Sequence, residues 1–233
     1  MRAMSRRLAM ILVGSGLALG VASGAAAQNP TEQQILVDRA RVTVDAFTAQ
    51  SDMEQMRQLL AKARGVIIFP QLLKAGFLVG GQGGSGVLLG RDPKTGSWTA
   101  PAFYTLGAGS IGLQIGAEAS EVMLLIMNER ALNAMINNQV KLGADATIAV
   151  GPIGKGVQAA TTTALSADIY SFARSKGLFG GISIEGAVIA ARDSWDRDYY
   201  GKAVTAGSIV LRREVEAPAA AGLQQALQRA ELH

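Results

Sequence analysis

The stretch GFLVGGQGGSGVLLG, residues 76–90, decides between two kinds of fold. Its glycines Gly81, Gly83 and Gly86 have the spacing of a dinucleotide-binding fingerprint, in which a strand ends in a tight turn and a helix begins at the phosphates. Here a short apolar run follows instead, and it ends in an Asp-Pro-x-x-Gly turn, which is typical of a strand and a hairpin. The same glycine spacing recurs at 107–112, again without a helix. We therefore interpret both segments as strands and expect no nucleotide to bind.

Residues 30–64, upstream of this stretch, predict two helices. Apolar side chains recur at helical spacing in the first of them. This stripe consists of Leu36, Ala40, Val44 and Phe47. Ser51 and Glu54 are spaced as a capping box, in which each side chain caps a backbone amide at the start of the second helix. We expect both helices to pack their apolar faces on the rest of the domain.

Downstream of the helices, the sequence changes to short apolar or alternating runs separated by glycine and proline, which is typical of strands. One helix interrupts them, with Asn128 as its N-cap, and two long strands are expected at 161–174 and 179–192. Glycines of one strand parity, such as Gly84 and Gly86, let a strand bend or another element approach its backbone. The fold class is therefore α+β: N-terminal helices packed on a strongly curved, largely antiparallel, glycine-rich sheet or barrel, in one domain.

The two ends of the chain have compositions of their own. A basic start, an apolar stretch and a small-residue Ala-Ala-Ala site before Gln28 predict that residues 1–27 are a secretory signal peptide. We therefore expect secretion through the inner membrane, to the periplasm or cell envelope. The domain is assigned to 30–212. Residues 213–233 are interpreted as a Pro/Ala linker and a weak amphipathic helix that form a tail.

Removal of the leader changes the charge balance. It takes three of the 22 Lys+Arg residues and none of the 18 Asp+Glu residues, which leaves 19 against 18 and a net charge of +1. That balance does not support a nucleic-acid partner.

Missing residue types exclude most catalytic chemistry. The chain has no cysteine, and its one histidine is the last residue, His233. Cysteine nucleophiles, Ser-His-Asp triads and His/Cys zinc sites are therefore absent. Asp193, Asp196 and Asp198 lie among arginines and lack EF-hand spacing, so we interpret them as a salt-bridged segment and not as a cation site. We expect no enzyme, no cofactor and no metal.

A series of sequence blocks resembles the SYLF domain family, in that family's order and over about residues 35–210. The blocks are GVIIFP, GGQGGSGVLL, GSWTAPAFYTLG, IGLQIGAE, LGADATIAVGPIGKG, IYSFARSKGLFGGISIEG and DRDYYG. The resemblance implies a non-enzymatic domain that binds a phospholipid or membrane surface: eukaryotic relatives bind phosphoinositide-containing membranes, some fungal members bind and bundle actin, and exported bacterial members are described as lipid-binding. The alternative is a structural or scaffold protein of the envelope that self-associates or binds a protein partner.

The loop ARSKGLFGG, residues 173–181, is the main candidate for contact with anionic lipid head groups. It combines cations, which are drawn to an anionic surface, with a large apolar pair, which burial would retain there. The sequence leaves open whether that apolar pair instead packs on the core. Lys155, in GPIGKG, is either a phosphate contact or a solvated hairpin tip. The candidate lipid-binding residues are Lys74, Lys155, Arg174, Lys176, Leu178 and Phe179.

Overall fold

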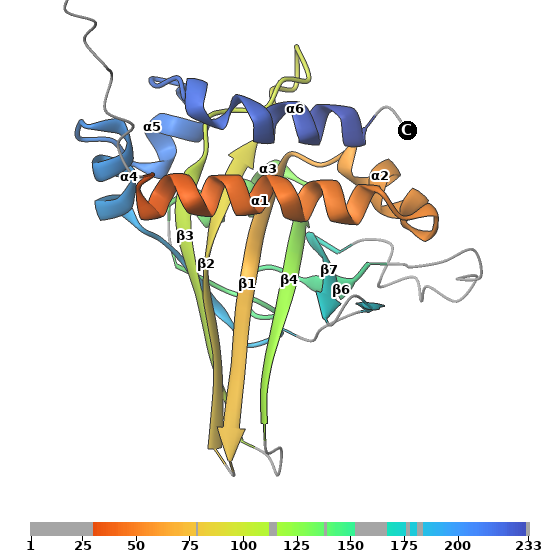
Figure 1. Cartoon of the computed structure of the whole chain (residues 1–233). Coiled ribbons are helices and arrows are strands. Elements are labelled where there is room, and N and C mark those ends of the chain that lie inside the picture. Colours follow the sequence, from red (N-terminus) through yellow and green to blue (C-terminus); the bar gives the residue numbers. More distant parts are fainter. Residues whose placement is uncertain are drawn as a thin grey trace, which may run out of the picture.

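Helices lie across a sheet whose long central strands continue well beyond them (Figure 1). The computed structural model describes residues 30–77, 79–111, 116–137, 139–151, 167–175, 178–180 and 184–231. The helices are α1 (Glu32–Thr48), α2 (Glu54–Leu60), α3 (Glu129–Asn137), α4 (Asp193–Tyr200), α5 (Ala206–Val210) and α6 (Ala221–Ala230). The strands are β1 (Gly65–Phe77), β2 (Val79–Gly90), β3 (Ala102–Ile111), β4 (Gly116–Ile126), β5 (Val140–Lys141), β6 (Ile148–Val150), β7 (Ile169–Ser175), β8 (Leu178–Gly180) and β9 (Val188–Ala191). None of the helices in the described ranges is long and apolar enough to cross a bilayer.

The strands form one curved sheet in the order β5-β9-β3-β2-β1-β4-β7-β6, and β8 also pairs with β7. All strand pairs are antiparallel except β6 with β7. Strand β2 runs without interruption through Gly81, Gly83 and Gly86, so no helix follows the glycine fingerprint. The predicted α+β class with N-terminal helices on a largely antiparallel, curved sheet is confirmed.

The long strands have two halves of different composition. Where the helices cover them, their side chains are apolar and buried on both faces, as at 66–69, 87–89 and 122–126. Farther along, glycine and alanine prevail, and 80–85 and 117–119 are exposed or half-buried. Burial of apolar area stabilises the first half. The second half projects past the helices and leaves an open angle beneath α1 (Figure 1).

Two glycines of β2 allow a close approach of β1. The register of β1 against β4 shifts after Phe69, which marks a bulge. A Cβ atom at Gly84 would lie 2.4 Å from the Gln71 carbonyl oxygen, and one at Gly86 would lie 2.6 Å from that of Ile68. Any side chain would collide there. The expected role of the one-sided glycines is confirmed.

The helix starts agree only partly with the sequence. Asn128 Oδ1 accepts the Ala131 N–H at 2.9 Å, so the predicted N-cap of α3 is confirmed. The predicted capping box is wrong: Ser51 begins a separate 3-10 turn, and the N-cap of α2 is Met53, which makes no capping bond. The connection between α1 and α2 is held by other hydrogen bonds, which the Arg57 side chain donates to the carbonyl oxygens of Thr48 and Gln50.

The two predicted long strands agree only in part with the structure. Of the strand expected at 161–174, residues 169–174 belong to β7, residues 167–168 are not in a strand, and 161–166 lie outside the described part. Downstream, β8 and β9 are separate short strands, and a turn with Gly186 at φ +81° precedes β9. Glycine is the residue that adopts this conformation most readily.

The C-terminal helix is part of the core, so its interpretation as a tail is corrected. Helix α6 packs against α1, and Leu223 and Leu227 are buried (Figure 1). Glu231, just after α6, accepts the Trp98 Nε1–H at 2.7 Å and pairs with Arg91 at 2.6 Å. The short amphipathic pattern looked weak because α1 supplies the partner surface from the other end of the chain.

Candidate functional site

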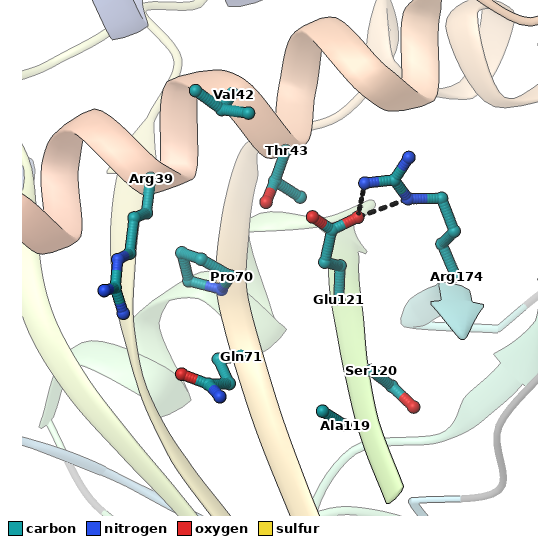
Figure 2. Close-up of a pocket in the computed structure, with 9 residues that line it drawn as sticks. All are labelled: Arg39, Val42, Thr43, Pro70, Gln71, Ala119, Ser120, Glu121 and Arg174. Atoms are coloured by element: carbon teal, nitrogen blue, oxygen red, sulfur yellow. Dashed lines mark hydrogen bonds and ion pairs between the residues drawn. The ribbon is translucent and has the colours of Figure 1, made fainter. Parts of the chain in front are cut away.

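A groove lies in the angle between α1 and the projecting half of the sheet. It consists of two adjoining cavities of about 550 and 330 Å³. Both are lined by Arg39 of α1 and by Pro70 and Gln71 of β1, so they form one continuous depression. Figure 2 shows Arg39 extending from α1 alongside Pro70 and Gln71.

The α1 wall of the groove comes from a face of the helix that does not enter the core. Ile35, Arg39 and Val42 are spaced four and three residues apart, which places them on one side of a helix. Val42 is 52 % exposed and Ile35 is 38 % exposed, while the predicted core stripe members Ala40, Val44 and Phe47 are buried. Arg39 therefore lies between two exposed apolar side chains on this face of α1.

The sheet wall combines the β1 bulge with polar side chains of β4. The bulge directs Pro70 and Gln71 toward α1, and Ser120 and Glu121 line the larger cavity next to them. Leu73, 53 % exposed, lines the smaller cavity. A leucine exposed to this degree beside a cavity is available to an apolar ligand.

Arg174 of β7 and Glu121 of β4 form an ion pair at the polar side of the groove (Figure 2). The two residues are directly opposite each other in the antiparallel register. The hydrogen bond from the Arg174 Nε–H to the Glu121 carboxylate raises the pKa of the arginine. Both side chains are about a quarter exposed, so the pair remains accessible from the groove.

Arg39 is the other cation of the groove. Within the described residues, its guanidinium has neither a hydrogen bond nor an ion-pair partner. An arginine presents five donors in a rigid fork that matches a phosphate or carboxylate. The larger cavity therefore holds two guanidinium groups against one carboxylate, while Glu32 lines the smaller cavity.

Trp195 of α4 lines the smaller cavity. The Arg192 guanidinium lies 3.5 Å from the centroid of the Trp195 ring and donates to Ser85 Oγ at 2.9 Å. On the inner side of α4, Asp196 is buried and accepts the Phe103 backbone N–H at 2.8 Å. Burial raises the pKa of the Asp196 carboxyl to about 7.

The acidic segment before the C-terminus is a helix and not a salt-bridged loop. Asp193, Asp196 and Asp198 all lie in α4. Only Asp196 faces inward. Among the described residues, no cluster of three or more acidic or histidine side chains is arranged to hold a metal.

The structure brings one predicted site residue, Arg174, into the groove. Lys74 lies on β1, opposite Gln82 and Glu118. It directly follows Leu73, which lines the groove, so the Lys74 side chain is on the other face of the sheet. Lys155 and Lys176 lie outside the described residues. The backbone of Leu178 and Phe179 forms β8, but their side chains are not described, so insertion and core packing both remain predictions.

Sequence reasoning missed Arg39, Val42, Pro70, Gln71 and Glu121 as neighbours of Arg174. They come from α1, β1 and β4, which meet only through the fold. One signal was present: Ile35 and Val42 are apolar residues outside the core stripe of α1.

Comparisons with known proteins agree on one family. The family profile Ysc84, described as "Las17-binding protein actin regulator", matches residues 107–230, just over half of the chain. SH3 domain-containing YSC84-like protein 1 of Xenopus laevis is 37 % identical over 145 residues, 62 % of this chain and 43 % of that protein. The Homo sapiens protein of the same name is 34 % identical over 154 residues, 66 % of this chain and 44 % of that protein.

A fungal relative extends the match. Protein YSC84 of Saccharomyces cerevisiae is 33 % identical over 174 residues, which is 73 % of this chain and 36 % of that protein. The chain spans less than half the length of these relatives. Of these descriptions, that of the family profile refers to binding and regulation.

Proposed function

The chain belongs to the SYLF (Ysc84) family, and from that premise we propose that it binds anionic lipid at a membrane surface without catalysing a reaction. The observation that carries this proposal is the groove beneath α1. Arg39, without a partner among the described residues, lies there between the exposed apolar side chains of Ile35 and Val42. A cation attracts an anionic head group, and adjacent apolar area retains the hydrocarbon beside it.

The predicted loop site and the groove belong to one proposed membrane-binding surface. Strands β7 and β8 pair so that the backbone of Phe179 lies directly opposite Arg174, which lines the groove. The backbone of β8 is therefore next to the strand that carries Arg174. We propose that loop and groove contact one membrane together, with Lys155 as a further basic candidate.

The expected leader belongs to this proposal. We propose that residues 1–27 are removed during export and that the domain acts in the periplasm or cell envelope. Mass spectrometry of protein from its native cells should give a mature chain that begins at Gln28. A chain that retains Met1 or Arg2 would refute the proposed location.

Sedimentation with vesicles tests the lipid proposal. Vesicles that contain phosphatidylglycerol should bind the protein, and pure phosphatidylcholine vesicles should bind it much less. The Arg39→Gln variant should bind the anionic vesicles about fivefold more weakly, since one cation near such a surface contributes about 1 kcal/mol. Its binding should also depend less on salt.

The matched control is Arg212→Gln, which removes the same charge from an exposed residue outside the groove. This variant should bind like the wild type. Equal binding by wild type and Arg39→Gln at every salt concentration would refute the groove as the lipid contact. No binding to either vesicle would refute the lipid proposal as a whole.

A protein partner is the second candidate. The description of the family profile refers to Las17 binding and actin regulation, which favours a protein-binding surface somewhere on this domain. Size-exclusion chromatography separates self-association from lipid binding, because a scaffold protein would elute as an oligomer without vesicles.

A further inference from the structure

The two ends of the groove differ in chemistry, and this difference indicates a ligand with a head and a tail. The larger cavity contains Arg174 and Glu121 together with the Thr43 and Ser120 hydroxyl groups. The smaller cavity contains Ile35, Leu36 and Leu73. Arg39, Pro70 and Gln71 line both, so a ligand could pass from one to the other without leaving the groove.

The charges give the ligand a direction. The larger cavity is lined by two cations, Arg39 and Arg174, and by one carboxylate, Glu121, so the sum of these charges is positive. At the far end, Glu32 lines the smaller cavity, and its charge acts on Arg192, so those two charges offset each other. An anionic head group is therefore favoured between Arg39 and Arg174.

The size of the apolar end limits what can occupy it. Its volume of about 330 Å³ is at the small end of the roughly 300–1,000 Å³ range of ligand pockets. A single hydrocarbon chain fits that space along Ile35, Leu36 and Leu73. Trp195 lines this cavity and not the larger one, so it would contact the chain and not the head group.

We propose that the groove binds one single-chain anionic amphiphile, with its head group between Arg39 and Arg174 and its chain directed along Leu73 to Trp195. This proposal rests on the proposed lipid-binding function and adds the class and orientation of the ligand. The shared chemistry of the head group is a phosphate ester or a carboxylate. The occupant is a monomeric amphiphile taken from solution or from a membrane.

Trp195 provides a direct measurement. The chain has two tryptophans, and the other one, Trp98, is buried against Glu231 and does not line the groove. The probe is a single-chain phosphatidate (lysophosphatidate) with a nitroxide on the distal part of its chain, used below its critical micelle concentration. Binding should quench the fluorescence of Trp195, and the Trp195→Phe variant should show no saturable quenching.

Variants of each end test the orientation. Leu73→Asp should weaken the quenching isotherm by about tenfold or more, since it places a charge where the chain lies. Arg39→Gln should weaken it by about fivefold. The matched controls are Val150→Asp, at an equally exposed apolar residue outside the groove, and Arg212→Gln. Both should bind like the wild type.

The comparison ligands separate the head from the chain. Glycerol phosphate has the same head group without a chain and should not compete at concentrations at which the amphiphile saturates. Competition by glycerol phosphate at equal concentration would show an anion site only and would overturn the proposal.

The vesicle assay distinguishes failure of this proposal from failure of the function. If the protein binds anionic vesicles but the labelled amphiphile leaves Trp195 unquenched, the groove is not a chain site and this inference is wrong, while lipid binding stands. The same conclusion follows if Leu73→Asp binds the amphiphile like the wild type. If neither vesicles nor amphiphile bind, both proposals fail.

Discussion

Replacing Asp196 by asparagine should remove a pH dependence of stability that this one carboxyl group creates. The side chain is 0 % exposed, and its Oδ1 accepts the Phe103 N–H. Its Oδ2 has no hydrogen-bond partner among the described residues. Burial, with a smaller effect from the charge of Asp193, raises the pKa of Asp196 from 3.8 to about 7.

The sign and size of the effect follow from this pKa. The native state holds the proton more tightly than the unfolded chain does, so the stabilisation is complete below about pH 4 and is lost as the pH rises to about 7. Each pH unit between the two values corresponds to about 1.4 kcal/mol. The loss across the interval is then about 4 kcal/mol. Asparagine keeps an acceptor for Phe103 and carries no charge, so the variant should not lose this stability.

Urea unfolding at a series of pH values measures the effect. The free energy of unfolding of the wild type minus that of Asp196→Asn should fall by a few kcal/mol between about pH 4 and pH 8. Asp198→Asn removes a charge from the exposed side of the same helix and reports the effect of net charge alone. If wild type and Asp196→Asn give parallel curves over this range, the buried carboxyl does not titrate as argued.

Three further predictions concern other parts of the molecule. Asp168→Ala should destabilise the protein by about 3 kcal/mol at neutral pH, because the carboxylate accepts hydrogen bonds from several neighbours. Arg130→Gln should destabilise it less, because the Arg130 side chain is 74 % exposed. Urea unfolding of both variants tests this, and equal losses of stability would contradict it. Those bonds lower the pKa of Asp168 against the effect of burial, so its stabilisation is present above about pH 4 and should be lost as acid titrates the folded protein. Glu121→Gln should strengthen binding to anionic vesicles by about fivefold, since Arg174 loses its internal carboxylate partner; unchanged or weaker binding would mean that Arg174 does not meet the lipid. Leu227→Ala should lower stability by about 2–5 kcal/mol in thermal or urea unfolding, and a change near zero would restore the tail interpretation.

The parts of the fold that depend on local pattern could be predicted from the sequence. The core stripe of α1, the N-cap at Asn128 and the strand character of the glycine-rich stretch all follow from spacing within one segment. Gly84 and Gly86 were also interpretable, because a one-sided run of glycine indicates a close approach whatever element makes it. In each case the prediction depends on contacts within one segment, or only on the fact that another backbone comes close to it.

Features that depend on distant segments could not be predicted. Helix α6 looked weak in isolation because its partner, α1, begins about 190 residues earlier in the chain. The groove could not be predicted for the same reason, since Arg39 of α1 and Arg174 of β7 are distant in the sequence and are brought together only by the folded sheet. Arg174 was selected for its loop and not for Glu121, its partner across the sheet.

The groove under α1 also links ligand occupancy to folding. Its lining residues come from α1, β1, β4 and β7, so an unfolded chain contains no such site. A ligand that binds only the native state stabilises it by mass action, by about 2.7 kcal/mol when its free concentration is a hundred times its dissociation constant. The melting temperature should therefore rise with the concentration of a true ligand. A chain that is still unfolded, during synthesis or during passage across a membrane, carries no ligand, so the protein must acquire its ligand in the compartment where it folds.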